Sequence, residues 1–445
     1  MSQRSVVVLG GGVAGIAAAV GHHELGFRIT LVEARRHLGG RAFSLAARRL
    51  GQKIDNGPHV LLGCYRAFRR VLRALGAEQS FHRPDALQLT WLSKGGRVER
   101  MTGKRLPAPL HLVAGFLGIR GLELTQRFEL LLAGLAPFLP LPRGGVTVAT
   151  WLRHAGFDGT ARTYLFDPLC RAVMNAEPDQ CDAGLFVGTL REAFAGNRAH
   201  SAMWIPVEPW DAILDKPARD WLGRHGHRVL LGHRATTLEA RRPAPSVRLD
   251  DGTLLADHDR LVVALDWRSA HSLTKRFAVA PAADRIPNSP LVTVHVALPP
   301  TAVPFDDPIV ALLGGQPFHF LCRRPRLDGA VRADVPASLL AGGATDLDGM
   351  PAARIVSLAL GQLANHLGRT APWPEETHAS ALVVREPRAT IAPRPSIDDL
   401  RPTPGPTHIE GLWLAGDWTA TGLPSTLEGA ARSSLDPLGQ VTNDV

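Results

Sequence analysis

Three glycines near the start of the chain are spaced as in a loop that holds a diphosphate. Gly10, Gly12 and Gly15 follow the pattern G-x-G-x-x-G, between an apolar run and an alanine-rich segment. Glycine at these positions permits a tight turn, a close approach of the backbone to a pyrophosphate, and close packing of a helix on a strand. The helix would then offer the free N–H groups of Val13 and Ala14 to the phosphates.

An acidic residue follows the glycines at the distance that this pattern requires. Glu33 ends the next apolar run, where its carboxylate can accept hydrogen bonds from both hydroxyls of an adenosine ribose. The negative charge disfavours a 2′-phosphate, so the pattern favours NAD or FAD over NADP. The strand, the helix and the acid together make a chance glycine-rich turn a poor explanation.

The segment that begins at Glu33 separates FAD from NAD. It reads EARRHLGGR and ends at Arg41, whose guanidinium can neutralise a diphosphate, while Gly40 lets the backbone approach a cofactor. This segment resembles the flavin amine oxidase and carotenoid desaturase superfamily. The resemblance implies that Ala34, Gly40 and Arg41 contact FAD.

The C-terminal part of the chain carries a second segment of the same superfamily. Residues 412–430 read LWLAGDWTATGLPSTLEGA. By resemblance, Gly416 and Asp417 contact the ribityl or phosphate part of FAD, and the backbone at Ser425 and Thr426 faces the flavin N1/O2 edge. A helix that begins there would stabilise the negative charge of a reduced flavin.

Residues 55–65 narrow the resemblance. They read DNGPHVLLGCY, which resembles the D-x-G-x-H…G-x-Y segment of plant-type phytoene desaturases and, more closely, the hydroxysqualene dehydroxylases of bacterial hopanoid synthesis. Residues 167–175 (DPLCRAVMN) and 383–390 (VVREPRAT) are similar to the same narrower family. The resemblance implies that Gly57 and Pro58 lie against the flavin, although Pro58 stands where glutamine is more frequent.

The reaction that this resemblance implies is the reductive removal of the allylic hydroxyl of hydroxysqualene, a terpenoid alcohol, to give squalene. Such a reaction needs a proton donor for the leaving hydroxyl, a dry apolar cavity, and hydride from a reduced flavin. His59 is one candidate donor, and its alternative is a structural hydrogen bond to a backbone carbonyl. Glu428 is the second candidate, and its alternative is an ion pair with Arg432 one helical turn away.

The elements that must position these residues predict an α/β fold. Short apolar runs predict strands at 5–9, 28–32, 227–231, 246–250, 260–265 and 411–415, with a helix at 13–25. The stretch 227–265 resembles the third FAD segment of the superfamily, whose backbone meets the adenine near Ala235. We expect a discontinuous Rossmann-type FAD-binding domain made of residues 1–70, 201–270 and 400–445. The remainder, 71–200 and 271–399, predicts an α+β substrate domain, mostly helical in its first part and with one helix near 353–367.

Residues 107–142 are unusually apolar and predict a pair of helices with two alternative roles. The first is a shallow contact with a membrane, which would guard a tunnel for a lipid substrate, with Arg120 and Arg127 at the lipid headgroups. The second is the core of the substrate domain. A C30 terpene dissolves in a bilayer rather than in water, which favours the first.

Composition limits the remaining classes. The chain has 445 residues and a net charge of +9, but its basic residues are scattered without a basic tail or an aromatic array, so no nucleic-acid partner is expected. Its four cysteines form no C-x-x-C pair, which argues against a disulfide scaffold, a zinc ribbon or an iron–sulfur cluster, and no metal site is expected. We expect a cytoplasmic protein, with the inner face of the membrane as an alternative; the oligomeric state stays open.

Three other functions compete with the dehydroxylase. A carotenoid desaturase would remove hydride from a polyene instead of adding it, and product analysis would separate the two. An amine oxidase generally lines its flavin with an aromatic cage, for which two tyrosines, Tyr65 and Tyr164, are few. A prenyl-binding chaperone could share the fold, but Glu33, Arg41 and Asp417 argue for a bound cofactor. A colourless purified protein would favour the chaperone.

Overall fold

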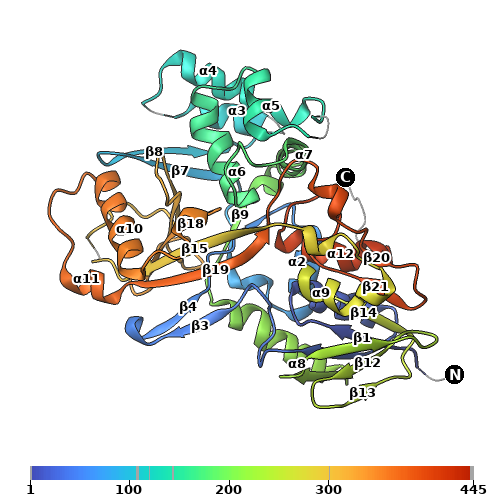
Figure 1. The fold of residues 1–445 in the computed structure, drawn as a ribbon. Coiled ribbons are helices and arrows are strands. Elements are labelled where there is room, and N and C mark those ends of the chain that lie inside the picture. Colours follow the sequence, from blue (N-terminus) through green and yellow to red (C-terminus); the bar gives the residue numbers. More distant parts are fainter. Residues whose placement is uncertain (1–2, 107–109, 120, 143–144, 300, 441–445) are drawn as a thin grey trace.

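Six strands from distant parts of the chain form one sheet at the end of the molecule that carries the N-terminus (Figure 1). The computed structural model describes residues 3–106, 110–119, 121–142, 145–299 and 301–440. The strands lie in the order β10-β2-β1-β14-β21-β20. Only β20 is antiparallel to its neighbour. Their bounds are β1 Ser5–Leu9, β2 Arg28–Glu33, β10 Arg228–Leu231, β14 Arg260–Val263, β20 Gly405–Pro406 and β21 Leu412–Leu414.

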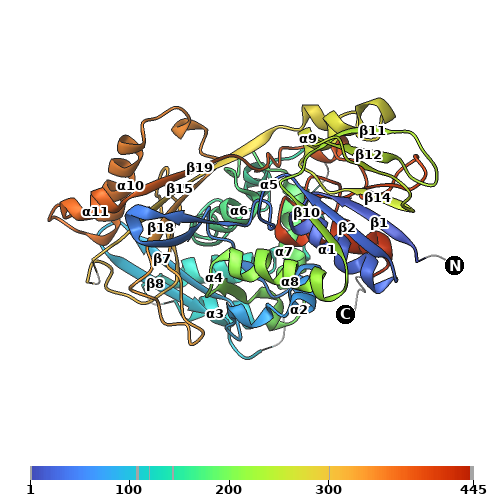
Figure 2. The same cartoon turned by 90° about the horizontal axis from the view of Figure 1, so that it is seen from below.

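The inner strands are apolar because both faces of this sheet are covered. Helices α1 (Val13–Glu24), α12 (Leu427–Leu435) and α2 (Arg66–Leu75) pack together on one side. Figure 2 shows the small antiparallel sheet of β11, β12 and β13 on the other side, with α9 beside it. The bounds of these four elements are β11 Ala235–Glu239, β12 Ser246–Leu249, β13 Leu254–Leu255 and α9 Trp267–Thr274. All six strands that the sequence predicted are present. Gly26, at φ +80°, follows the end of α1, as was also predicted.

A second sheet of seven strands forms the other half of the molecule. Its order is β19-β15-β18-β17-β16-β7-β8, and it buries a separate apolar core against α10 (Ala352–Leu367). The strand bounds are β7 Gln88–Ser93, β8 Arg97–Thr102, β15 Asn288–Val296, β16 Ile309–Leu312, β17 Phe320–Cys322, β18 Ala337–Gly342 and β19 Leu382–Ile391. Helix α10 lies where the sequence predicted it, and α11 (Glu375–Ser380) follows it.

The prediction that residues 71–200 are mostly helical is incomplete. Strands β7 and β8 lie in this stretch and join the second sheet, because Trp91 and Leu92 of β7 pair in parallel with Ala311 and Leu312 of β16. This pairing joins residues more than two hundred positions apart, so local sequence patterns carry little sign of it.

Short strands and helices link the two sheets. The hairpin of β3 (Ser44–Ala47) and β4 (Gln52–Asp55) leads to β5 (Leu61–Leu62), which pairs with β9 (Met203–Pro206). Strand β9 also pairs with β6 (Phe81–His82). Helix α8 (Lys216–Arg224) packs beside β10.

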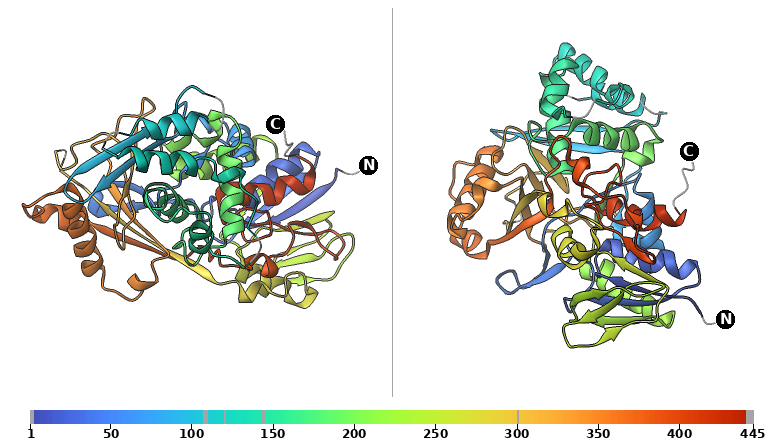
Figure 3. Two further views of the ribbon diagram at one scale, coloured as in Figure 1. Left: turned by 90° about the horizontal axis from the view of Figure 1, so that it is seen from above. Right: turned by 45° about the vertical axis from the view of Figure 1, so that its right-hand side comes forward.

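Helices α3 and α4 project at the end of the molecule opposite the N-terminal sheet (Figure 3). The helices of this region are α3 Leu110–Leu117, α4 Leu124–Ala133, α5 Val148–His154, α6 Asp167–Met174 and α7 Ala183–Phe194. The predicted pair of helices is therefore present, while 107–109 and Arg120 lie outside the described residues. Among the residues that the structure describes, no helix has both the length and the apolar character needed to cross a membrane.

Candidate active site

The glycine loop before α1 has the shape that the sequence predicted. Gly10 adopts φ +104°, and a Cβ on Gly15 would lie 1.8 Å from the Gly10 carbonyl oxygen, so both positions need glycine. Gly12 precedes α1, and no described side chain caps that helix end. The first N–H groups of α1, at Val13 and Ala14, therefore remain available to an anion.

Two further glycines keep the neighbouring loop close to this one. A Cβ on Gly40 would lie 2.8 Å from the Gly12 Cα, and the Gly39 N–H donates to the Gly11 carbonyl at 2.8 Å. The two loops thus meet backbone to backbone at Gly12 and Gly40. Such a surface fits a diphosphate, which needs N–H donors at short range.

Glu33 lies at the end of β2, beside the glycine loop. Its Oε2 accepts the Gly11 N–H at 2.7 Å, and its Oε1 accepts the Arg35 N–H at 2.8 Å. Each oxygen keeps a second lone pair, so the carboxylate can still accept a ribose hydroxyl. The Glu33 carbonyl accepts the His233 N–H at 3.1 Å, which places the segment leading to Ala235 next to it.

Arg41 joins the second FAD segment to the first. Its guanidinium forms an ion pair with Asp417 and donates to the Ala389 carbonyl at 2.9 Å. Thr426 caps α12 by accepting the Gly429 N–H at 3.0 Å, and Ser425 Oγ accepts the Ile391 N–H at 3.4 Å.

Residues predicted to touch FAD from three parts of the chain therefore meet. Gly416 is held there by its N–H, which donates to Ser433 Oγ at 2.8 Å. Ala34 follows β2 directly. The donor set of two helix starts, backbone N–H groups, one arginine and one ribose-binding acid suits a dinucleotide.

A cleft lies between the seven-stranded sheet and residues 53–60 and 205–206. It holds about 540 Å³ of empty space, its open mouth included, and Pro58 and His59 form part of its wall. Its apolar lining consists of Ile54, Val60, Ile205, Pro206, Pro308, Ile309, Val335 and Pro336. No tyrosine, tryptophan or phenylalanine occurs among the described residues that line it.

His59 is fixed in orientation by a backbone carbonyl. Its Nδ1 lies 2.8 Å from the Gly57 carbonyl oxygen, and the ring stands edge-on to Trp210 at 5.4 Å. We infer that Nδ1 carries a proton and donates it to this carbonyl, which leaves Nε2 as the ring nitrogen available to a substrate. Burial lowers the pKa of His59, and the negative charge of Asp55 opposes that effect.

Asp55 holds a buried ion pair behind His59. Its Oδ2 accepts from Arg324 at 2.6 Å, and its Oδ1 accepts the Ser44 hydroxyl at 2.7 Å and the Trp210 N–H at 3.1 Å. The side chains of Asp55 and Arg324 are 8% and 11% exposed. Arg324 was not predicted as a site residue, because nothing in the sequence indicates that the loop after β17 faces the end of β4.

Glu428 lies away from the cleft and is fully engaged. Its Oε1 accepts the Ala67 N–H at 3.1 Å and Arg432 Nε at 2.9 Å, and its Oε2 accepts the Phe68 N–H at 2.9 Å. Arg432 also donates to both oxygens of Glu192. Burial raises the pKa of Glu428, and Arg432 opposes that shift. The carboxylate therefore caps α2, which is a positioning role.

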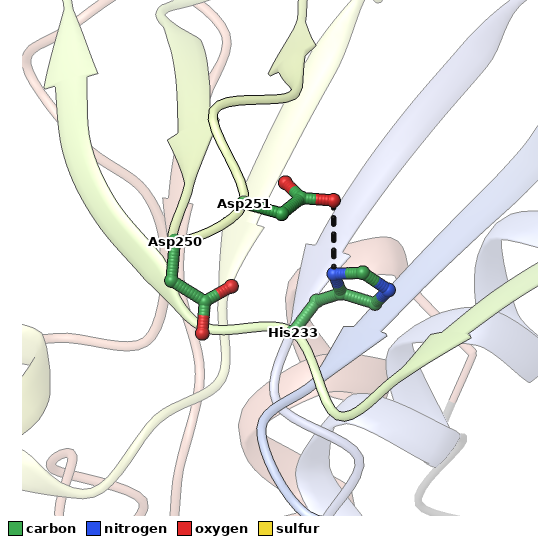
Figure 4. Close-up of side chains that lie close together, drawn as sticks. All are labelled: His233, Asp250 and Asp251. Carbon is green, nitrogen blue, oxygen red and sulfur yellow. Dashed lines mark ion pairs between the residues drawn. The ribbon is translucent and has the colours of Figure 1, made fainter.

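One group of carboxylates and a histidine could in principle hold a metal. His233 Nδ1 lies 3.3 Å from Asp251 Oδ2, with Asp250 beside them (Figure 4). Asp250 accepts the Arg234 N–H, and Asp251 accepts from the backbone and hydroxyl of Thr253. These bonds explain the acids as turn residues, so we assign no metal here.

Known proteins match this chain along nearly its whole length. The family described as flavin-containing amine oxidoreductase matches residues 13–436. The chain belongs to this family. It is therefore an FAD-dependent oxidoreductase, as the glycine pattern and the two FAD segments predicted.

Individual relatives match this chain over all or part of its length. Hydroxysqualene dehydroxylases of Sinorhizobium fredii and Rhodopseudomonas palustris are each 28% identical over 97% of this chain and 96% of theirs. The zeta-carotene desaturase of Solanum lycopersicum is 27% identical over 51% of this chain and 40% of its own. A solved oxidoreductase from Methanosarcina mazei shares the fold, with a TM-score of 0.71 at 14% identity over 98% of this chain and all of that one. The predicted α/β class is thus confirmed.

Proposed function

We propose that this oxidoreductase removes the hydroxyl group of hydroxysqualene to give squalene. The observation that carries the proposal is the end-to-end match to hydroxysqualene dehydroxylases, whereas the carotene desaturases match about half of the chain. The cleft supports it, because more than half of its lining residues are apolar and its described lining lacks the aromatic cage of an amine site, although Lys53, Asp55, Arg323 and Arg324 also line it.

In the proposed reaction the C–O bond of the allylic alcohol breaks, a C–H bond forms, and the oxygen leaves as water. FAD, when bound and reduced, supplies the hydride. The chain must then supply one proton to the leaving oxygen and keep bulk water from the allylic cation.

His59 is the residue that we assign to proton donation. Its Nδ1 is bound to the Gly57 carbonyl, so only Nε2 is free to hold a proton for the substrate. Asp55 favours the charged ring and Arg41 opposes it, while burial keeps the pKa below its usual value. Glu428 positions α2 instead.

For the cofactor we keep the full set of predicted contacts. The two facing backbone loops and the Arg41–Asp417 pair support the contacts of the first and last segments, and Gly57, Pro58 and Ala235 are kept from the resemblance alone. The set comprises Gly10, Gly12, Val13, Ala14, Gly15, Glu33, Ala34, Gly40, Arg41, Gly57, Pro58, Ala235, Gly416, Asp417, Ser425 and Thr426. We also keep the division into an FAD-binding part and a substrate part, since the six-stranded and the seven-stranded sheet each draw their strands from one of them; strand β6 of the substrate part, however, pairs with β9 of the FAD-binding part.

We further propose that α3 and α4 contact a lipid surface. Leu124 is 81% exposed and Phe128 59%, although Leu112, Phe116 and Leu130 of the same helices are buried. Lys104 and Arg105 are exposed beside them and suit anionic headgroups. Arg127 is partly used, since it donates to the Leu122 and Leu117 carbonyls. We propose on this basis a cytoplasmic enzyme that works at the inner face of the membrane.

The test is an anaerobic incubation of the reduced holoenzyme with hydroxysqualene, followed by mass analysis of the extracted lipid. We expect squalene in an amount that matches the flavin oxidised. The oxidised holoenzyme is incubated with phytoene in parallel. Desaturated polyene there, without squalene in the first arm, would replace the proposal with a carotenoid desaturase.

A further inference from the structure

One buried histidine on the sheet wall of the cleft has a ring nitrogen that makes no regular hydrogen bond to the described residues. His295 lies on β15, is 3% exposed and lines the cleft. Its Nδ1 is 3.0 Å from Ser338 Oγ and the ring also interacts with the backbone of Asp55, but its Nε2 has no partner at normal hydrogen-bond geometry among the described residues. Buried polar atoms in native proteins are almost always paired, so this nitrogen calls for an explanation.

The register of the sheet places this pair. Strands β15 and β18 are antiparallel, and His295 stands directly opposite Ser338. Thr293, two residues earlier, turns to the same side of β15, and its Oγ1 is also buried without a partner in the described chain. That oxygen lies 3.4 Å from the position a Cβ on Gly57 would take. The face of β15 that meets the segment of His59 thus carries two polar atoms that make no regular hydrogen bond to the described residues.

The electrostatics of His295 suit an uncharged ligand. Burial and the neighbouring charge of Arg324 lower its pKa to about 4, against a smaller opposing effect of the Asp55 backbone. The ring is therefore neutral near pH 7. If the Ser338 hydroxyl donates to Nδ1, the ring proton sits on Nε2, where it can be given to a hydroxyl oxygen in a hydrogen bond.

We propose that His295, oriented by Ser338, binds the hydroxyl group of the terpenoid substrate and makes the cleft select an alcohol over the matching hydrocarbon. The inference rests on the proposed function, which supplies the terpenoid class of the ligand. His59 and His295 both line this cleft, and both would contact the hydroxyl, one as proton donor and one as the residue that determines specificity. Sites built to bind a hydroxyl reject analogues that lack it, because their polar groups are left unpaired.

Binding of hydroxysqualene and of squalene to the oxidised holoenzyme, each in detergent micelles and followed by the flavin absorbance change, tests this. Wild-type protein is expected to bind the alcohol about 10- to 100-fold more tightly than the hydrocarbon. His295→Leu should remove that preference and leave squalene affinity unchanged. His295→Gln, whose amide can replace Nε2, should restore part of it. His319→Leu is the matched control, since His319 is 5% exposed, lies outside the cleft lining and pairs with Glu177.

Several results would overturn the inference. One is a wild-type protein that binds the alcohol no more tightly than the hydrocarbon. Another is a His295→Leu variant whose affinity falls equally for both ligands. A third is loss of flavin from that variant, which would assign the ring to the cofactor. Failure of the proposed function looks different. In that case no squalene would form from hydroxysqualene, while the alcohol preference and its dependence on His295 would persist and support the hydroxyl site.

Discussion

The buried ion pair of Asp55 and Arg324 offers a sharp test of how the two halves of the molecule are held together. Asp55 ends β4, and Arg324 follows β17 of the seven-stranded sheet, so the pair joins the two sides in the wall of the cleft. Replacing Asp55 with alanine removes an ion pair at 2.6 Å and two further hydrogen bonds, and leaves the Arg324 charge buried. Losing one partner of a buried pair costs about 3–5 kcal/mol.

This cost translates into a measurable shift of the melting temperature. The unfolding entropy of a chain of 445 residues is about 0.9 kcal/mol per kelvin, so Asp55→Ala should lower Tm by about 3–5 °C. The assay is differential scanning calorimetry of FAD-loaded protein at neutral pH. Asp334→Ala is the control, because its ion pair with Arg332 at 2.7 Å is largely exposed and should leave Tm almost unchanged.

A double variant separates the orphaned charge from the lost contacts. In Asp55→Ala/Arg324→Met the unpaired cation is gone, so this protein should melt above Asp55→Ala. The reasoning is wrong if Asp55→Ala shifts Tm no more than Asp334→Ala does. It is equally wrong if the double variant melts below the single one.

Four further outcomes are expected. Gly15→Ala should lose most of its flavin, because the new Cβ would lie 1.8 Å from the Gly10 carbonyl oxygen. The flavin content is measured as the ratio of flavin to protein absorbance of the purified protein. Gly188→Ala, in the interior of α7 with open space around it, should keep its flavin. The dehydroxylation rate should fall as pH rises through a pKa below 6.5, and His59→Gln should lose that limb, because burial lowers the pKa of His59; an unchanged profile in the variant would exclude His59 as the donor. Burial lowers the pKa of His22 to about 4, so between pH 6.5 and 4 the unfolded chain binds one proton more than the folded chain. The free energy of unfolding must therefore decrease as the pH is lowered through that window. In urea titrations at pH 7 and 4.5, His22→Gln should make this decrease smaller by about 2–3 kcal/mol. Leu124→Glu combined with Phe128→Glu should cut co-sedimentation with phosphatidylglycerol vesicles at least tenfold, whereas Leu327→Glu, at a site 63% exposed outside this region, should not.

The sequence alone was sufficient for the cofactor and for the sheet that binds it. Gly10, Gly12 and Gly15 lie within six positions, and Glu33 follows at the end of the next strand, so one βαβ unit carries the whole signal. Local units of this kind are set by short-range sterics and by the pattern of apolar residues. The second FAD segment was equally legible, since a strand, a turn and a helix start follow one another without a break.

The cleft was decided by the tertiary structure. Arg324 meets Asp55 across 269 positions, and His295 meets Ser338 only because β15 and β18 pair in one register. Glu428 could not be told from a catalytic acid until its oxygens were seen to hold the start of α2. A side chain's type shows which hydrogen bonds it can make. Which bonds it does make depends on the register of distant strands and on burial, and both arise only when the two sheets pack together.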